Sequence, residues 1–333
     1  MPYPGSIFLT GATGYVGGSL LVSLAHTYPL ATIAALVRNP DDSAAVSQVG
    51  PNVRVVLGSH TDHELIINEV SESDLVFQVS NLDDLGQESE LSTSIPPALQ
   101  HMRMNQAGML MESYQIWDDT DKDRLRNAVS IDAPHRIVDL EAIRAHEENV
   151  ADVYVICPPT IYGVGTGPVR RTSVQIPHAV RIFLEKRCAE YIALGTNTWS
   201  NVHINDLSRA FLIIVEHALR VQTNTEKEEQ NTKRDGFDNF YFTGAAEHEW
   251  GLVLAEVAQV MHRKGLLETP IAKSIPVEYD RILSYYIGTS CRVRSTRLKS
   301  LGWEPKEKGI KETVSEDVDA SLEMIKSGRK PNF

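Results

Sequence analysis

Short apolar runs alternate with longer, partly apolar stretches over the first eighty residues. The first of the longer stretches is apolar on nearly every side, as expected of a helix that packs on a sheet. Strands that alternate with helices pair in parallel through right-handed crossovers, so the pattern predicts a doubly wound parallel sheet, an α/β Rossmann fold. The predicted strands span residues 6–10, 32–37, 53–57 and 74–79, and the predicted helices span residues 18–26, 41–49 and 63–70.

The remainder of the chain is less regular. The pattern predicts a Rossmann domain over residues 1–160 with parts of 195–245, and a smaller α+β substrate-binding part over 161–195 and 245–333. Residues 223–239 are dense in polar residues and predict an exposed insertion. Further predicted elements are strands at 101–104 and 153–157, a polar loop region at 117–128, a glycine-rich loop at 163–167, and helices at 137–149, 180–186, 206–218 and 251–262.

A glycine turn follows the first predicted strand and opens the first predicted helix. Its sequence TGATGYVG places Gly11, Gly14 and Gly17 in GxxGxxG spacing. Glycine suits a backbone with positive φ, a close approach to a pyrophosphate, and close contact between helix and strand. The helix N-terminus offers free N–H groups to the same pyrophosphate. The turn therefore predicts dinucleotide binding, with Thr10, Thr13, Tyr15 and Val16 as further cofactor contacts; the alternative is a turn that only packs.

The end of the second predicted strand bears on which dinucleotide binds. An acidic residue there accepts hydrogen bonds from a ribose 2′-hydroxyl, whereas Arg38 stands there in this chain. Arginine suits a 2′-phosphate, and such a contact is worth roughly 1.5–3 kcal/mol. The sequence thus predicts NADP(H) rather than NAD(H), the alternative being an arginine that only faces water.

The net charge and the cysteine content limit which classes of binding partner and which compartment we expect for this chain. The net charge of −12 disfavours nucleic acid and anionic membranes. Residues 1–37 carry no charged side chain, but their glycines and prolines interrupt any membrane-spanning helix and no basic segment precedes them. The three cysteines are scattered and form no metal-binding spacing, which favours a reducing compartment and a cytoplasmic protein without a metal.

Several motifs resemble the extended short-chain dehydrogenase/reductase (SDR) superfamily, and in particular its NmrA-like and epimerase/dehydratase-like branch. The resemblance rests on TGATGYVGG, VRNP, CPPTIYG and VHINDLSRA, while SVQIP, WSNVH and LGWEP are similar to fungal members. It implies an oxidoreductase that binds NADP(H), with Ser80, Pro158 and Pro159 lining the cofactor. It also implies a small organic substrate. Many relatives are homodimers, but no feature of this sequence decides the oligomeric state.

The chain departs from the superfamily at its usual catalytic pair, a tyrosine with a lysine four residues later. None of the eleven tyrosines has that lysine. His135 and Asp139 stand one helical turn apart where the pair is expected, so His135 is a candidate acid or base oriented by Asp139. The alternative is a structural pair that fixes the start of the helix with Arg136. Gln106, or Asn105 beside it, replaces the usual serine and is a candidate hydrogen-bond partner of a carbonyl or amide.

A substrate pocket is predicted from aromatic and polar residues in the later part of the chain. Paired arginines at positions 292 and 294 favour salt bridges over ligand contacts, and Asp206 favours a helix cap over chemistry. For each pocket candidate, a place in the core is the alternative. The candidates are Trp117, Trp199, His203, Tyr285 and Tyr286.

Three functions remain open from the sequence. The first is an NADP(H)-dependent oxidoreductase that reduces a secondary-metabolite ketone, imine or conjugated alkene with an atypical proton donor. The second is a cofactor-assisted cyclase of Diels–Alder type, with or without coupled redox chemistry, which works by positioning its substrate. The third is a non-catalytic NADP(H) sensor that regulates a partner protein.

Overall fold

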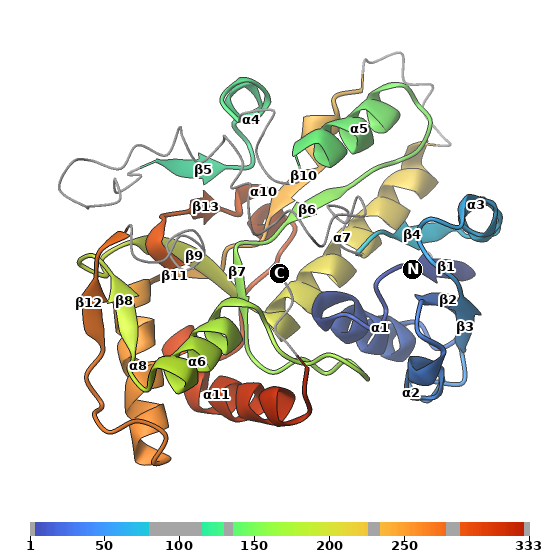
Figure 1. Cartoon of the computed structure of the whole chain (residues 1–333). Helices are drawn as coiled ribbons and strands as arrows, with labels where there is room; N and C mark the ends of the chain where they lie inside the picture. The colour runs from blue at the N-terminus through green and yellow to red at the C-terminus, as the bar shows by residue number, and fades with distance from the viewer. Residues whose placement is uncertain (1–3, 80–114, 130–135, 226–233, 278–286, 330–333) are drawn as a thin grey trace. The chain divides into compact units, whose positions relative to one another are not determined.

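The computed structural model describes residues 4–79, 115–129, 136–225, 234–277 and 287–329 (Figure 1). These residues group into two compact units. Unit 1 contains residues 4–79, 164–171 and 204–225, and unit 2 contains the other described residues. The domain boundaries expected from the sequence stay a prediction, because residues 80–114 lie outside the described part of the chain.

Unit 1 is built on a four-stranded sheet in the order β3-β2-β1-β4. All three strand pairs are parallel, with Ile7 opposite Ile33 and Leu75 in the two neighbouring strands. This confirms the doubly wound parallel sheet. The strands are β1 (Ser6–Leu9), β2 (Thr32–Val37), β3 (Val53–Leu57) and β4 (Leu75–Phe77).

Helices cover both faces of this sheet. On one face α1 packs against α7, and apolar residues of both helices join the core that lies over β1 and β2. On the other face Phe8, Leu36 and Val56 pack against α3. The chain therefore forms the layered arrangement that the alternating pattern predicts. The helices of unit 1 are α1 (Tyr15–Thr27), η1 (Pro40–Asp42), α2 (Ser43–Ser47), α3 (His63–Ser71) and α7 (Ile204–Thr225).

Unit 2 carries several small groups of strands. Three strands pair in the order β11-β9-β7, in which β7 and β9 are parallel while β9 and β11 are antiparallel. The other pairs, β6 with β10, β8 with β12 and β5 with β13, are parallel. These strands are β5 (Ile116–Asp118), β6 (Val155–Cys157), β7 (Thr160–Tyr162), β8 (Glu190–Ile192), β9 (Thr198–His203), β10 (Phe240–Phe242), β11 (Ala246–Glu249), β12 (Lys273–Ile275) and β13 (Arg292–Arg294).

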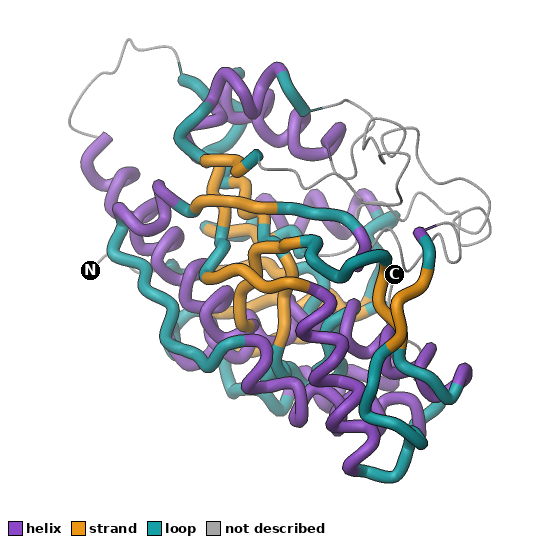
Figure 2. Tube along the Cα trace, turned by 90° about the vertical axis from the view of Figure 1, so that its left-hand side faces the viewer, coloured by secondary structure: helices purple, strands orange, loops and turns teal. Residues whose placement is uncertain are grey.

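Two apolar clusters organise unit 2. The larger joins α6, α8 and α11 around fully buried Trp250 and Phe183, and Figure 1 shows these helices side by side. The smaller surrounds Phe237 and lies against α4, α5 and β10. Figure 2 shows all described helices and strands by type. The helices of unit 2 are α4 (Lys122–Asn127), α5 (Arg136–Glu147), α6 (Gln175–Lys186), η3 (Gly236–Asn239), α8 (Trp250–Arg263), α10 (Thr296–Ser300) and α11 (Ile310–Lys326).

The prediction of a polar loop at residues 117–128 was wrong. The segment forms β5 and α4, and the side chain of Asp121 accepts a hydrogen bond from the Arg124 backbone N–H as a helix cap. Leu125 is the apolar anchor of this short helix and is buried. Lys122 forms ion pairs with Asp235 and Asp238, which lie more than a hundred residues away in the sequence. These distant partners hold the helix in place, and the polar sequence of the helix alone does not predict it.

The exposed insertion predicted at residues 223–239 is also corrected in part. Residues 223–225 complete α7, and η3 follows at Gly236–Asn239. Phe237 within η3 is fully buried, and the guanidinium of Arg126 lies 4.6 Å from the centre of its ring. The polar flanks of the segment conceal this apolar anchor. The strand predicted at residues 101–104 lies outside the described residues.

Candidate functional site

The glycine turn lies between β1 and α1 in unit 1. Gly11 has a φ of +73°, in the left-handed region that glycine adopts without strain. The Gly14 N–H donates to the Gly11 carbonyl at 2.9 Å, and Gly14 is the N-cap residue of α1. The turn therefore brings the chain out of the strand and directly into the helix.

Close packing explains the spacing of the three glycines. A Cβ at position 17 would lie 2.2 Å from the Gly11 carbonyl oxygen, and one at position 14 would lie 3.1 Å from the same oxygen. Real Cβ atoms do not approach an oxygen to 2.2 Å, so no side chain fits at Gly17 unless the backbone moves. The turn and the helix start form a compact backbone cradle.

This cradle has the properties of a phosphate site. The first turn of any α-helix has N–H groups without intrahelical partners, and the helix dipole favours an anion there. No acidic residue occupies the first turn of α1 to oppose an anion. The residues present therefore fit the pyrophosphate of a dinucleotide, which would meet backbone rather than side chains.

Thr10 has a structural task at the same edge of the sheet. Its hydroxyl lies 2.9 Å from the side-chain oxygen of Gln78 and accepts a hydrogen bond from the Val79 N–H at 3.2 Å. These contacts tie the end of β1 to the end of β4. Thr10 is 2% exposed, and its hydrogen bonds stabilise the backbone at the start of the glycine turn.

Arg38 directly follows β2, which is the neighbour of β1 in the parallel sheet. The carboxyl ends of parallel strands share one edge of a sheet, so Arg38 lies on the same edge as the glycine turn. Its side chain is exposed. Asn39 beside it caps η1 by accepting a hydrogen bond from the Asp41 N–H. A contact between Arg38 and a 2′-phosphate stays a prediction.

The structure describes only part of the predicted catalytic set. Asp139 lies in α5, where its charge acts on Arg136 and on the Cys157 thiol. Burial is the main cause that raises the pKa of Cys157 to about 12, and Asp139 adds to it. The Arg136 guanidinium donates to the carbonyl oxygens of Leu125 and Arg126, at 2.9 and 3.0 Å, and so fastens α5 to α4. His135, Gln106 and the predicted contacts Ser80, Tyr285 and Tyr286 lie outside the described residues.

Three predicted pocket residues are packed into unit 2. The Trp117 ring packs on the Phe237 cluster under the guanidinium of Arg124, 5.0 Å from the ring centre. Trp199 packs on the larger core and donates its indole N–H to the Thr289 carbonyl. Both tryptophans thus make the kind of packing contacts that we gave as the alternative to a place in a substrate pocket.

His203 is 7% exposed and lies edge-on against the Tyr162 ring, with 5.3 Å between ring centres. A Cβ at Gly163 would lie 2.1 Å from its Nε2 atom, so the backbone of Gly163 presses on the imidazole. Pro158 and Pro159 lie between β6 and β7, and a cofactor contact there stays a prediction. Asp206 is buried in the first turn of α7 and forms an ion pair with Arg209.

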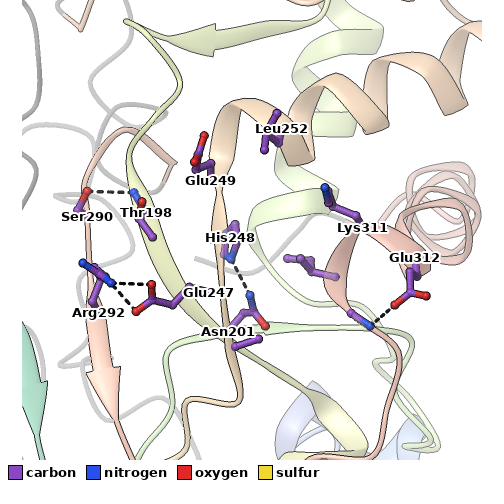
Figure 3. Close-up of a pocket in the computed structure, with 13 residues that line it drawn as sticks. Thr198, Asn201, Glu247, His248, Glu249, Leu252, Ser290, Arg292, Lys311 and Glu312 are labelled. Carbon is purple, nitrogen blue, oxygen red and sulfur yellow. Dashed lines mark hydrogen bonds and ion pairs between the residues drawn. The ribbon is translucent and has the colours of Figure 1, made fainter.

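A groove of about 680 Å³ opens elsewhere in unit 2 (Figure 3). Of the predicted pocket residues that the structure describes, Trp117, Trp199 and His203, none lines it. The paired strands β9 and β11 form one part of its lining. The first residues of α8, α11 and β13, and the residues just before α11 and β13, form the rest. Its lining residues are Thr198, Asn201, Ala246, Glu247, His248, Glu249, Leu252, Ser290, Arg292, Gly309, Ile310, Lys311 and Glu312.

Charged residues of this groove are partly paired with one another. Arg292 donates to both carboxylate oxygens of Glu247, at 2.9 and 2.8 Å, which confirms the expectation of a salt bridge at Arg292. The Gly309 N–H donates to Glu312 at 2.8 Å and closes a capping box on α11. Glu249 and Lys311 are exposed at the rim.

The polar centre of the groove is the pair His248 and Asn201. The Asn201 amide lies 2.9 Å from His248 Nδ1. Burial lowers the pKa of His248 to about 3, so its imidazole is neutral at physiological pH. His248 Nε2 and Asn201 Oδ1 have no hydrogen-bond partner among the described protein groups. A buried polar atom left in this state costs roughly 1–3 kcal/mol.

His248 was not among the residues predicted from the sequence to form a site, although its place in β11 carries a recognisable pattern. Of the four residues of β11, only His248 is buried. A polar residue at the inward position of a strand is the pattern that could have identified it. The strand was not recognised because AEHE has no apolar residue except alanine.

Two further searches bear on the class of protein. Within the described residues, no group of three His, Cys, Asp or Glu side chains is arranged to hold a metal ion. No helix of the described part of the chain is long and apolar enough to cross a membrane. All three cysteines are free thiols.

Comparison with known proteins agrees with this geometry. Residues 5–100 match the model of the NmrA-like family, and this range includes the glycine turn and Arg38. Over this range the chain is similar to the NmrA-like family. A curated relative from Acremonium sp., named Oxidase ucsJ, is 27% identical over 325 residues, covering 90% of this chain and 92% of the relative.

Solved structures share the fold over nearly the whole chain. The dTDP-glucose 4,6-dehydratase DesIV from Streptomyces venezuelae, solved with NAD and TYD bound, has a TM-score of 0.63 at 16% identity, covering 98% of this chain and 99% of that one. A dTDP-glucose 4,6-dehydratase from Bacillus anthracis, solved with NAD, has a TM-score of 0.60 at 16% identity, with coverage of 98% and 99%. The chain thus has the same fold as these solved dehydratases.

Proposed function

We propose that this chain is an NADP(H)-dependent oxidoreductase of atypical SDR type. Its substrate is a mid-sized secondary-metabolite ketone, imine or conjugated alkene. The observation that carries the proposal is the backbone cradle of Gly11, Gly14 and Gly17 at the N-terminus of α1. NAD in the solved neighbours and the name of the Acremonium relative support a nicotinamide cofactor and redox chemistry.

The residues of unit 1 divide the task of holding the cofactor. The cradle receives the pyrophosphate through backbone N–H groups, and Arg38 at the end of β2 pairs with the 2′-phosphate. When bound, NADP(H) supplies or accepts a hydride. Thr10 keeps the edge of the sheet rigid beneath it through Gln78 and Val79.

The proton chemistry differs from that of the superfamily, because no tyrosine of the chain has a lysine four residues later. In our proposal His135 gives or takes the proton, Asp139 orients it, and Gln106 holds the reacting carbonyl or amide. An iminium ion accepts a hydride with little acid assistance, so an imine tolerates the loss of the tyrosine and lysine better than an unactivated ketone. This favours substrates with imines or activated alkenes.

Replacing Arg38 tests the choice of cofactor. We expect Arg38→Ala to weaken NADPH binding about tenfold to a hundredfold, because a charge-assisted contact worth about 1.5–3 kcal/mol is lost. NADH binding should change little. Isothermal titration of both nucleotides measures the difference, with Arg54→Ala as control, since Arg54 is an exposed arginine of β3 that pairs with Glu69. Equal losses for NADPH and NADH would show that Arg38 does not recognise the 2′-phosphate.

A further inference from the structure

The segment between β7 and α6 closes into a small loop that belongs to unit 1. Residues 164–171 are part of unit 1, whereas Gly163 and Thr172 on either side are part of unit 2. The Gly165 N–H donates to the Arg171 carbonyl at 2.8 Å, and the Arg171 Nε–H donates to the Gly165 carbonyl at 2.7 Å. These two bonds fix Arg171 by its backbone and by its side chain.

Glycines let the 164–171 loop pack closely against the start of α1. A Cβ at Gly165 would lie 3.0 Å from the ring of Tyr15, the first residue of α1. A Cβ at Gly18 would lie 3.1 Å from the Gly167 Cα atom and 3.2 Å from the Ala12 carbonyl oxygen, which belongs to the glycine turn. The loop therefore borders the backbone cradle.

The guanidinium of Arg171 keeps donors for a ligand. Its Nε–H is bound to Gly165, but within the described residues its two Nη groups have no hydrogen-bond or ion-pair partner. Because Nε and both Nη atoms belong to one planar group, the Nη atoms also lie near Gly165, and Gly165 packs on the Tyr15 ring. A side chain fixed in this way loses less entropy on binding, and guanidinium donors match the geometry of a phosphate.

The cradle needs more positive charge than its backbone supplies. A helix N-terminus contributes only about half an elementary charge, which leaves a pyrophosphate largely unbalanced. The net charge of −12 adds repulsion from the rest of the chain. A full positive charge beside the first turn of α1 would offset both effects.

We propose that Arg171 binds the pyrophosphate of the dinucleotide as a side-chain partner of the cradle. Its Nη groups donate to phosphate oxygens while its Nε–H stays on the Gly165 carbonyl. The inference rests on the proposed function, because it assigns Arg171 to the same cofactor. Arg38 and Arg171 then have different tasks: Arg38 binds the 2′-phosphate, which only NADP(H) carries, and Arg171 binds the pyrophosphate, which both cofactors carry.

The test is a calorimetric titration of Arg171→Gln with NADPH and with NADH, at low and at high salt. We expect the affinity for both nucleotides to fall by about tenfold, because one charge-assisted contact is lost. Replacing Arg38, in contrast, should affect NADPH alone. The remaining affinity should depend less on salt than in the wild type, because one charge pair fewer is screened. A loop that is only loosened would weaken binding without changing its salt dependence.

Arg170→Gln is the matched control, because it removes the same charge from the neighbouring exposed position. We expect it to change either affinity by no more than about threefold, as is usual for an exposed charge. Arg171→Lys keeps the charge but lacks the planar group that reaches Gly165 and a phosphate together, so its affinity should lie between those of Arg171→Gln and the wild type. Melting temperatures show whether each variant is folded.

Three results would overturn the inference and leave the proposed function intact. These are wild-type affinity of Arg171→Gln for both nucleotides, a loss confined to NADPH, and an equal loss in Arg170→Gln. If Arg171→Gln does not fold, unchanged affinities in Arg171→Lys would overturn the inference instead. A folded wild-type chain that binds neither nucleotide would overturn the proposed function, and the inference would fall with it.

Discussion

The backbone of Gly17 packs directly against the carbonyl oxygen of Gly11, with no room for a side chain at position 17. The left-handed backbone of Gly11 turns that carbonyl toward the helix start, and the absence of a side chain at Gly17 lets the helix come close. The geometry that suits a pyrophosphate is therefore a property of backbone alone.

Gly17→Ala should damage the fold and the cofactor site together. Its methyl group would lie 2.2 Å from the Gly11 oxygen, and relief of such overpacking costs about 1–3 kcal/mol. We expect a lower melting temperature and weaker NADPH binding, with a smaller effect for Gly14→Ala, where the distance is 3.1 Å. Gly265→Ala is the control: it strains a φ of +71° but should leave NADPH affinity unchanged. Wild-type NADPH affinity in Gly17→Ala would disprove the role of the cradle.

The proton donor is tested at His135. We expect His135→Ala to lower turnover of an imine or activated alkene substrate while NADPH binding stays the same, because the imidazole acts on substrate only. Steady-state rates and nucleotide titrations measure the two effects separately. His26→Ala, at an exposed position in α1, controls for loss of a histidine elsewhere. Unchanged turnover in His135→Ala would remove this residue from the mechanism.

Hydrogen bonds connect the end of β7 and the residue after it to α11 and the segment before it. The Gly163 N–H donates to the Asp317 carboxyl at 3.1 Å, and the Tyr162 hydroxyl donates to the Lys308 carbonyl at 2.8 Å. Asp317 is 3% exposed, and burial raises its pKa to about 7, with Glu316 adding to the rise. The Thr313 hydroxyl donates to the Asp317 carboxyl at 3.1 Å and lies 3.1 Å from the Ile310 carbonyl. The hydrogen bonds from Thr313 and Gly163 favour the ionised carboxyl, but burial outweighs them.

The pH dependence of stability follows from that pKa. The pKa of Asp317 rises from 3.8 in the unfolded chain to about 7 in the folded one, so its contribution to stability is complete below pH 3.8 and is lost as pH rises through 7. The loss is on the order of a few kcal/mol. We expect Asp317→Asn, which mimics the neutral form, to flatten this dependence and to raise stability above pH 7. Denaturant unfolding from pH 4 to 8 measures it, and an unchanged slope would contradict this account.

The sequence predicted elements well where local pattern and packing agree. Helix α1 and strand β2 are apolar and lie at the predicted positions, because both are buried in one core. Helix α4 was missed because its stability depends on distant ion pairs of Lys122 and Arg126. Such contacts leave no periodic signal in the local sequence.

The candidate sites also differ in whether the local sequence is enough to predict them. The cofactor cradle was predictable because it lies within one stretch of chain, from β1 to the start of α1. The pair His248 and Asn201 was not, because its two residues are 47 positions apart and meet only when β9 pairs with β11. Trp117 and Trp199 were assigned to a pocket from their chemistry; both are half-buried and pack against apolar clusters, and a role in a pocket stays a prediction.

The cofactor cradle and the groove lie in different units of the whole chain. Unit 1 holds the complete cradle together with Arg38, and unit 2 holds the groove around His248. The exposed arginine at the end of β2 favours a phosphate locally, in a chain whose net charge of −12 repels anions overall. We therefore expect unit 1 to recognise the cofactor.

A fluorescence titration of the wild-type chain with NADPH, and with NADH in parallel, tests that claim most directly. We predict saturable NADPH binding at least about tenfold tighter than NADH binding, which corresponds to about 1.4 kcal/mol. Gly17→Ala serves as the variant with a disrupted cradle. Binding of neither nucleotide by a folded protein, or equal affinity for the two, would contradict the account.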